Sequence, residues 1–396
     1  TGTVATATQN SITTATGLVT VGAAGTQSAI AGIPFYSDGS TSLYTHNVSG
    51  TDDTANYNTA IGYTALDAVT TGDSNTAMGY AALGANNAGY DNVAIGHNAL
   101  LLNTGGHDNV AIGNGTLDAN TTGNNNTAIG RVALGANTTG DHNLAIGQSA
   151  LAANTTGTRN TAIGYQAYDG SDTENDNLAI GYQAMTTNTA GGTANVAVGN
   201  YTLDALTSGD NNVAVGDNAL SANNSGGSNT SIGHESLVAN TTGNSNVAIG
   251  KSALDANTTA DNNVGIGTGA LGANTEGHSN TAVGTEAATA NTTGDHLTAV
   301  GMNALIANTT ANDNTAVGYN SMLINTEGYS NTAIGIYSLR QNTTGDGNVA
   351  VGQSALLNNT TADNNTAVGY NAMYTNTTGA DNVAVGPYAL DALSTG

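Results

Sequence analysis

The chain has 396 residues, yet it contains one Phe, no Trp and only four Lys and Arg against 28 Asp and Glu. Its net charge of −24 argues against nucleic-acid binding, because neutralising phosphates requires clustered Lys and Arg. The lack of Cys excludes disulfides and thiolate metal sites, and no run approaches the roughly 18 apolar residues of a membrane span, so none is expected.

Residues 1–57 differ from the rest of the sequence. They carry alternating stretches at 4–8 and 17–21, separated by Gly and Ser, and lack the repeat that follows. Alternation of apolar and polar residues is typical of strands. We expect a small β-rich segment over 1–57, serving as a cap or a connector.

Residues 58–396 repeat every 17 residues with the consensus N-[TV]-A-[IV]-G-x-x-A-L-x-A-N-T-T-G-x-x. We number these positions as columns 1 to 17, with Asn58 in column 1. The column 5 glycine occurs in 20 copies, and one residue is inserted between Gly181 and Gly199. The sparse apolar residues thus recur at a fixed spacing, which separates this chain from a disordered polymer of similar composition.

The length of the repeat predicts the fold class. A 17-residue unit with two short apolar stretches is too short for two packed helices, whereas the alternation in columns 2–4 is a strand signal. We therefore predict an all-β protein, a parallel β-solenoid (β-roll) of about 20 coils. Identical columns would stack about 4.8 Å apart and give a rod about 95 Å long.

Several columns carry a structural expectation. Column 4 holds only Ile, Val or Met, and column 9 holds Leu in 15 of 20 copies, so both are expected to fill the interior. Column 2 alternates between Thr and Val and is expected to point inward too, which disfavours an outward Thr array of the ice-binding kind. Glycines of column 5, and most of column 15, are expected in turns with positive φ.

Column 1 is Asn in 19 of 20 copies, with Leu297 as the exception. An Asn at the same turn of every coil can hydrogen-bond along the axis to its copies above and below. This predicts an internal Asn ladder that starts with Asn58, Asn75, Asn92, Asn109, Asn126, Asn143, Asn160 and Asn177.

Column 12 begins an N-T-T triplet in ten copies, which is an acceptor sequence for N-glycosylation. Glycans on neighbouring coils would collide at a spacing of about 5 Å. A second Asn ladder is therefore the favoured interpretation, with glycosylation as the alternative.

The motif N-[TV]-A-[IV]-G-x-x-A, as in residues 126–133, resembles the head repeat of trimeric autotransporter adhesins. Residues 7–13 and 17–22 resemble segments of phage tail fibres and related bacterial adhesive fibres. The resemblance covers residues 58–396 in the repeats, although this coil is longer than the family's because of the N-T-T-G stretch. It implies a β-roll that packs as a homotrimer, located outside the cell, on a cell surface or on a virion appendage.

These features predict a structural or adhesive segment of an extracellular fibre that presents or extends a surface-binding tip. Its expected partners are copies of itself and a cell-surface receptor or glycan. We do not expect an enzyme, because catalysis needs a unique constellation of residues and this chain is nearly the same in every coil. The alternative is a filament subunit that polymerises through solenoid ends and outer faces.

Acidic and amide residues gather in columns 16 and 17. Stacked carboxylates repel, and a Ca²⁺ ion bound between neighbouring loops would relieve that repulsion. The candidate ligands are Asp91, Asp108, Asp346 and Asp363, and no other cofactor is expected. The alternative interpretation is that they are solvated turn residues.

Tyr occurs six times in the otherwise polar column 6, which is expected to face outward. Tyr63, Tyr80, Tyr165 and Tyr182 are candidates for binding a sugar or a partner chain. The alternative is ordinary stacking between coils. Because the copies within 168–195 depart furthest from the consensus and include the inserted residue, we also expect a protruding loop there.

Overall fold

The computed structural model describes residues 28–30, 33–35, 43–44, 54–188 and 191–395. These residues form strands and turns without a helix, so nothing in the described part is a helix able to cross a bilayer. Strands β1 (Ser28–Ile30) and β2 (Ile33–Phe35) form an antiparallel pair. The stretches at 4–8, 7–13, 17–21 and 17–22 lie outside the described residues, as does most of the predicted cap over 1–57.

Each coil of the repeat contributes one short strand over columns 2–4, and one further strand of the same sheet precedes residue 58. These strands are β3 (Leu43–Tyr44), β4 (Thr59–Ile61), β5 (Thr76–Met78), β6 (Val93–Ile95), β7 (Val110–Ile112), β8 (Thr127–Ile129), β9 (Leu144–Ile146), β10 (Thr161–Ile163), β11 (Leu178–Ile180), β12 (Val196–Val198), β13 (Val213–Val215), β14 (Thr230–Ile232), β15 (Val247–Ile249), β16 (Val264–Ile266), β17 (Thr281–Val283), β18 (Thr298–Val300), β19 (Thr315–Val317), β20 (Thr332–Ile334), β21 (Val349–Val351), β22 (Thr366–Val368) and β23 (Val383–Val385).

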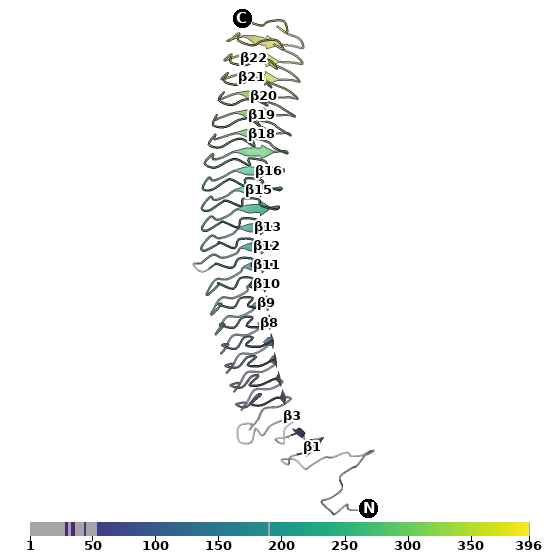
Figure 1. Ribbon diagram of the computed structural model, residues 1–396, viewed down its shortest axis with the longest axis vertical. Coiled ribbons are helices and arrows are strands. Elements are labelled where there is room, and N and C mark those ends of the chain that lie inside the picture. Colours follow the sequence, from purple (N-terminus) through teal and green to yellow (C-terminus); the bar gives the residue numbers. More distant parts are fainter. Residues whose placement is uncertain (1–27, 31–32, 36–42, 45–53, 189–190, 396) are drawn as a thin grey trace, which may run out of the picture.

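The strands stack in sequence order from β3 to β23, each parallel to the next and in register (Figure 1). A step of one coil joins residues 17 apart, as where Thr161 pairs with Leu178. The result is one sheet along a gently curved rod, which confirms the predicted parallel β-solenoid. The sheet begins one strand before the repeat does, since β3 pairs with β4 but precedes residue 58.

Hydrogen bonds between coils are not confined to the strands. The amide of Leu66 donates to the carbonyl of Ala82 at 2.9 Å, and the amide of Thr121 donates to the carbonyl of Thr138 at 2.9 Å. Columns 5, 7, 11 and 17 repeat such bonds from coil to coil. The coils are therefore hydrogen-bonded to one another on several sides of the rod and not only along the sheet, which a chain with few large apolar residues needs.

The interior is filled by columns 3, 8 and 9. Ala60 of column 3 and Leu66 of column 9 are fully buried, whereas Ile61 of column 4 is 39% exposed. The prediction that columns 2 and 4 point inward is therefore wrong. Successive residues of a strand face opposite sides, and a coil closed in 17 residues has room inside for Ala but not for Ile at that point.

Columns 5 and 15 require glycine for different reasons. Gly62 in column 5 has a φ of +139°, as expected for a turn glycine. Gly123 in column 15 has no positive φ, so that prediction is wrong. A Cβ there would lie 2.4 Å from Oδ1 of Asn120 and 2.5 Å from the carbonyl oxygen of Gly140. Column 15 is glycine because neighbouring coils approach too closely for any side chain.

Candidate functional site on the outer columns

Column 1 is a continuous ladder of buried amides. The backbone amide of Asn126 donates to Oδ1 of Asn109 at 3.0 Å, and its Nδ2 donates to the carbonyl of Gly140 at 2.8 Å. The same backbone-to-Oδ1 bond joins each of the eight predicted members to the next, from Asn58 to Asn177. All eight are buried, so their role is internal.

Column 12 forms a second ladder. Nδ2 of Asn137 donates to Oδ1 of Asn120 at 2.9 Å and to the carbonyl of Gly140 at 3.1 Å. Both asparagines are fully buried. Since the glycan-accepting nitrogen is enclosed and already bonded, a glycan at these positions is incompatible with the folded coil.

The candidate calcium ligands lie in two different columns. Asp91 and Asp108 are in column 17 with left-handed φ values of 53° and 55°, and Asp108 contacts Nδ1 of His107 at 2.8 Å. Asp346 and Asp363 are in column 16, where Oδ1 of Asp363 accepts the backbone amide of Asp346 at 2.8 Å. The described residues contain no group of three or more His, Cys, Asp or Glu side chains placed to hold a metal. A calcium site thus stays a prediction.

Column 16 carries a bonding pattern that sequence reasoning missed. Oδ1 of Asp141 accepts the amide of Asn124, and Nδ1 of His278 takes the same role for Asp261. Asp, Asn and His each have a side-chain acceptor atom at a similar distance from the backbone. Their recurrence in column 16 is the sequence signal that could have predicted these hydrogen bonds. The column serves to satisfy backbone amides of the preceding coil.

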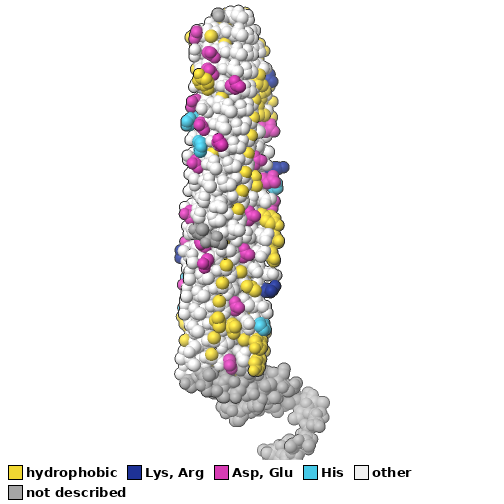
Figure 2. All heavy atoms as spheres, turned by 60° about the vertical axis from the view of Figure 1, so that its left-hand side comes forward, with side chains coloured by type: hydrophobic (Ala, Val, Ile, Leu, Met, Phe, Trp, Pro, Cys, Tyr) yellow, Lys and Arg dark blue, Asp and Glu magenta, His cyan; other side chains and the backbone are white. Residues whose placement is uncertain are grey.

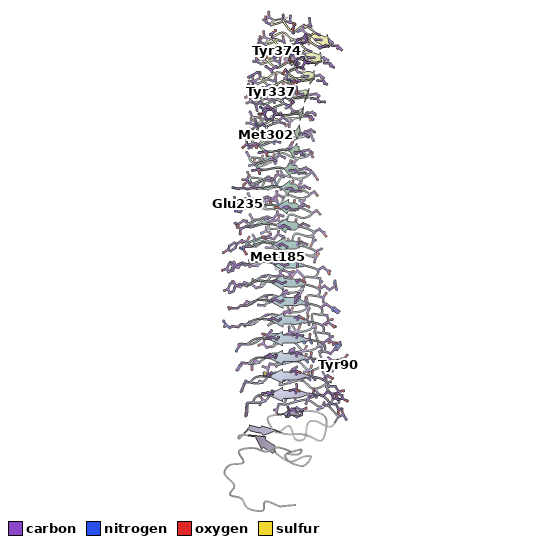
Figure 3. All side chains as sticks on the ribbon, turned by 90° about the vertical axis from the view of Figure 1, so that its right-hand side faces the viewer. Tyr90, Met185, Glu235, Met302, Tyr337 and Tyr374 are labelled. Carbon is purple, nitrogen blue, oxygen red and sulfur yellow. The ribbon has the colours of Figure 1, made fainter. Side chains whose placement is uncertain are left out.

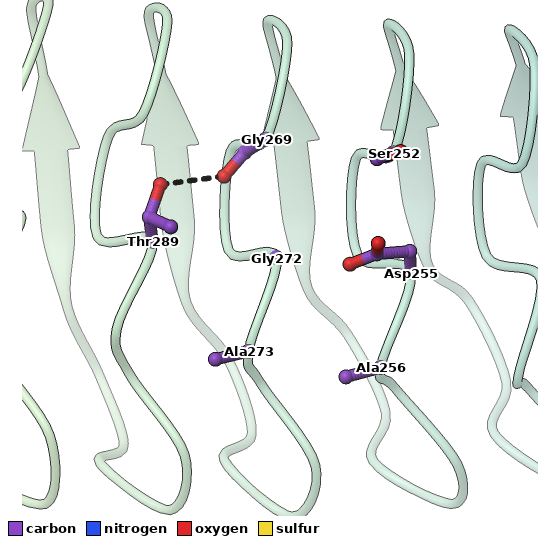
Figure 4. Close-up of a pocket in the computed structure, with 7 residues that line it drawn as sticks. All are labelled: Ser252, Asp255, Ala256, Gly269, Gly272, Ala273 and Thr289. Atoms are coloured by element: carbon purple, nitrogen blue, oxygen red, sulfur yellow. Dashed lines mark hydrogen bonds between the residues drawn. The ribbon is translucent and has the colours of Figure 1, made fainter.

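A shallow hollow interrupts columns 7 and 10, where Gly269 and Gly272 leave a gap between neighbouring coils (Figure 4). Asp255 borders it, and burial raises the pKa of its carboxyl. On the other side Thr289 donates its hydroxyl to the carbonyl of Gly269 at 2.6 Å. The hollow offers the carboxylate of Asp255 and the carbonyl oxygen of Gly269 as acceptors.

The irregular coil within 168–195 contains a buried polar network. Tyr168 replaces the column 9 Leu, and its hydroxyl accepts Nδ2 of Asn177 at 2.5 Å and Nδ2 of Asn188 at 3.0 Å. Glu174 replaces the column 15 Gly, and its carboxylate accepts the hydroxyl of Ser171 and three backbone amides.

The inserted residue lies between columns 12 and 15 of the next coil, since Asn188 bonds to the carbonyl of Gly192 four residues on, where other coils span three. Residues 189–190 lie outside the described residues, and they are part of the stretch 168–195 in which a protruding loop was expected. Column 1 keeps its ladder across the insertion, because the amide of Asn195 donates to Oδ1 of Asn177 at 2.9 Å.

Columns 6 and 7 form an aromatic edge. The four predicted tyrosines are exposed, from 71% for Tyr63 to 40% for Tyr165, as column 6 was expected to be. They also stack between coils, with ring centroids 5.9 Å apart for Tyr63 and Tyr80 and 5.2 Å apart for Tyr165 and Tyr182. Figure 2 shows hydrophobic side chains gathered in patches along one side of the rod.

Other members of the edge repeat this arrangement. Tyr337 of column 7 lies against Tyr319 of column 6, and the guanidinium of Arg340 lies 5.5 Å from the centre of the Tyr337 ring. In Figure 3, Tyr337 and Met302 lie on one side of the rod and Tyr90 of column 16 on the other. The edge is therefore distinct from the acidic columns.

Columns 2 and 4 form an apolar outer face along the sheet. Column 2 contains only Thr, Val and Leu, and column 4 only Ile, Val and Met, so no charge occurs among these positions in 20 coils. Examples of exposed members are Met78 at 44% and Ile334 at 42%. Such a strip is unusual on a chain of net charge −24.

Comparison with models of known protein families and with curated proteins gave no match, so what the chain does has to be inferred from its geometry.

Proposed function

We propose that the chain is a structural, adhesive segment of an extracellular fibre and that it assembles as a homotrimer. The supporting observation is the apolar outer face of columns 2 and 4. Similar charges keep rods apart, and this face of two columns runs the length of the repeats without any charged residue. Copies of the same chain are the partner that would match it in length and spacing.

The size of the face is adequate for stable association. About 20 coils at about 4.8 Å give a strip about 95 Å long, and two outward residues per strand make it about 10 Å wide. The resulting area of about 950 Å² per copy is similar in total to the roughly 800 Å² that each partner buries in an ordinary specific interface, and a trimer would divide it between two neighbours. Thr and Val replace each other freely in column 2. Because the two side chains have similar shapes, this exchange indicates contacts made by packing rather than by hydrogen bonds of the Thr hydroxyl.

The trimeric state is supported by the resemblance of the repeat to trimeric adhesin heads. The fibre role is supported by the construction of the chain, in which length accumulates by repetition of nearly the same coil. The aromatic edge supplies exposed tyrosines for a receptor or glycan, as adhesion requires.

The solution mass of the 38.9 kDa chain tests the assembly. The variant Ile146→Lys with Ile163→Lys places two charges on the apolar face, and Thr139→Lys with Thr156→Lys places two on the exposed column 14 of neighbouring coils. We expect a trimer at every concentration for the wild type and the column 14 variant, and a monomer for the column 4 variant.

Each other outcome has a distinct meaning. A wild-type monomer at all concentrations would contradict assembly through this face. A stable dimer would keep the face as the interface and overturn the number three. Growth into long polymers with rising concentration would favour the filament subunit over the fibre segment.

A further inference from the structure

Tyrosines from consecutive coils lie in pairs along the aromatic edge. The ring centroids are 5.9 Å apart in Tyr63–Tyr80, 5.2 Å in Tyr165–Tyr182, 5.4 Å in Tyr182–Tyr201, 5.6 Å in Tyr319–Tyr337 and 5.3 Å in Tyr370–Tyr388. The first two pairs are stacked and the other three are edge to face.

These rings are accessible as well as close together. Tyr80, Tyr182, Tyr201 and Tyr388 expose between 40% and 55% of their surface, and the rings project from the variable columns 6 and 7 rather than from the packed interior. An exposed ring can turn about its side-chain bonds at little cost, so stacked partners can reach an edge-to-edge arrangement.

We propose that these five pairs are sites of dityrosine formation, which would join consecutive coils covalently. The chain has no Cys, so disulfides cannot serve this purpose. Coupling of phenols is an oxidative cross-link open to a chain without Cys, and the repeat places the phenols at contact distance.

The oxidant is hydrogen peroxide acting through a haem peroxidase. Each phenol gives up one electron and one proton and becomes a phenoxyl radical. The two radicals form a carbon–carbon bond between ring positions next to the phenol oxygens, and the hydrogen at each bonding carbon moves to the oxygen of its own ring. The pair loses two electrons and two protons in all, and these reduce one peroxide to two waters.

Proximity favours coupling within one chain over coupling between chains. The partner ring is already within about 6 Å, which corresponds to an effective concentration far above that of rods free in dilute solution, and the proposed trimer would pack columns 2 and 4 rather than the aromatic edge against other copies. The links would close loops of one coil, joining residues 17 to 19 positions apart.

The test treats the full chain with peroxidase and hydrogen peroxide at micromolar concentration and maps linked peptides by mass spectrometry. We expect the five pairs as cross-links, each two hydrogens lighter than its separate peptides, in a chain that still migrates as a monomer in denaturing gels. Tyr182→Phe should abolish the links to Tyr165 and Tyr201 and leave the Tyr63–Tyr80 link unchanged.

Tyr329→Phe is the matched control. Tyr329 is 54% exposed but lies in column 16, where its neighbours in adjacent coils are Asn312 and Asp346. In Tyr329→Phe the yield of the Tyr165–Tyr182 and Tyr182–Tyr201 cross-links should stay near the wild-type value. It should be at least tenfold higher than the yield of the same cross-links in Tyr182→Phe. Phe should not disturb the fold, since column 6 also accepts His, Asn and Gln.

Three results would overturn the proposal. One is oxidation of the tyrosines without cross-links between the paired peptides. Another is participation of Tyr329 as often as the paired tyrosines. The third is cross-links that join different chains into larger species on denaturing gels in preference to links within a chain.

Discussion

Asn154 and Ser171 occupy column 12 in consecutive coils, yet no hydrogen bond joins them. Nδ2 of Asn154 still donates to Oδ1 of Asn137 at 2.9 Å, but Oδ1 of Asn154 is buried without a partner. The hydroxyl of Ser171 donates instead to Oε2 of Glu174 at 3.2 Å. The second ladder is thus interrupted in the coil that also carries Tyr168, next to the coil with the inserted residue.

The first ladder has a comparable gap that a substitution can close. Leu297 offers no oxygen to the backbone amide of Asn314, although its own amide donates to Oδ1 of Asn280 at 2.8 Å. Leu297→Asn should supply the acceptor and slow hydrogen exchange of the Asn314 amide about tenfold, as for a bond worth about 1.4 kcal/mol. Leu297→Ala provides no oxygen and should give no protection. Unchanged exchange in Leu297→Asn would contradict this role for column 1.

Close approach between coils predicts opposite effects for two glycines. At Gly140 a Cβ would lie 2.4 Å from Oδ1 of Asn137 and 2.4 Å from the carbonyl oxygen of Gly157. Gly140→Ala should lower the free energy of unfolding by about 1–3 kcal/mol. Gly105 of column 14 has open space around it, so Gly105→Ala should raise that free energy by about 0.4–1 kcal/mol. Denaturant titration of both variants measures the difference, and equal effects would refute it.

Substitutions in the acidic column 16 can distinguish two roles of its carboxylates, which are accepting a backbone amide of the preceding coil (capping) and binding calcium. Asp363→Asn retains an oxygen for the amide of Asp346 and should change stability by less than about 0.5 kcal/mol, whereas Asp363→Ala should cost about 1 kcal/mol. A calcium site would instead lose its charge in the Asn variant. Thermal midpoints with calcium and with chelator separate the two, because capping alone leaves them equal in every variant.

The buried Tyr168 predicts a loss of stability at high pH. Burial raises the pKa of its phenol above the value of about 10 in an unfolded chain. Its contribution is therefore complete below pH 10 and is lost as the pH rises toward the folded pKa. We expect the wild type to lose more stability above pH 10 than Tyr168→Phe does, by thermal melts across pH 9–12. Tyr80→Phe, at an exposed site, should behave like the wild type.

The repeat was enough to predict the solenoid, because 17-residue spacing and columns 2–4 constrain the coil strongly. It did not reveal which side of the strand is inside, since Ala60 and Ile61 are both apolar. The decision depends on the width of the coil, which admits the smaller residue. The sequence gives no direct measure of the width of the coil. It sets that width only through the requirement that 17 residues complete one turn.

Contacts between coils were harder to predict than the fold. Asn109 and Asn126 could be paired because a ladder needs only one residue type at one column. Asp346 and Asp363 looked like repelling charges, because the sequence does not show that a backbone amide points at each carboxylate. Gly123 looked like a turn glycine for a similar reason, since close approach and positive φ leave the same mark in a sequence.

The uniformity of the coils has a consequence for alignment between copies. A rod whose columns repeat every 17 residues presents nearly the same contacts to a neighbour after a slide of one coil, about 4.8 Å. Regular columns therefore hold rods together without setting their stagger. The positions that break the pattern, such as Tyr168 with Glu174 and Leu297, occur once each along the rod. A fixed stagger between copies would have to be set by such irregular positions and by the variable columns rather than by the regular ones.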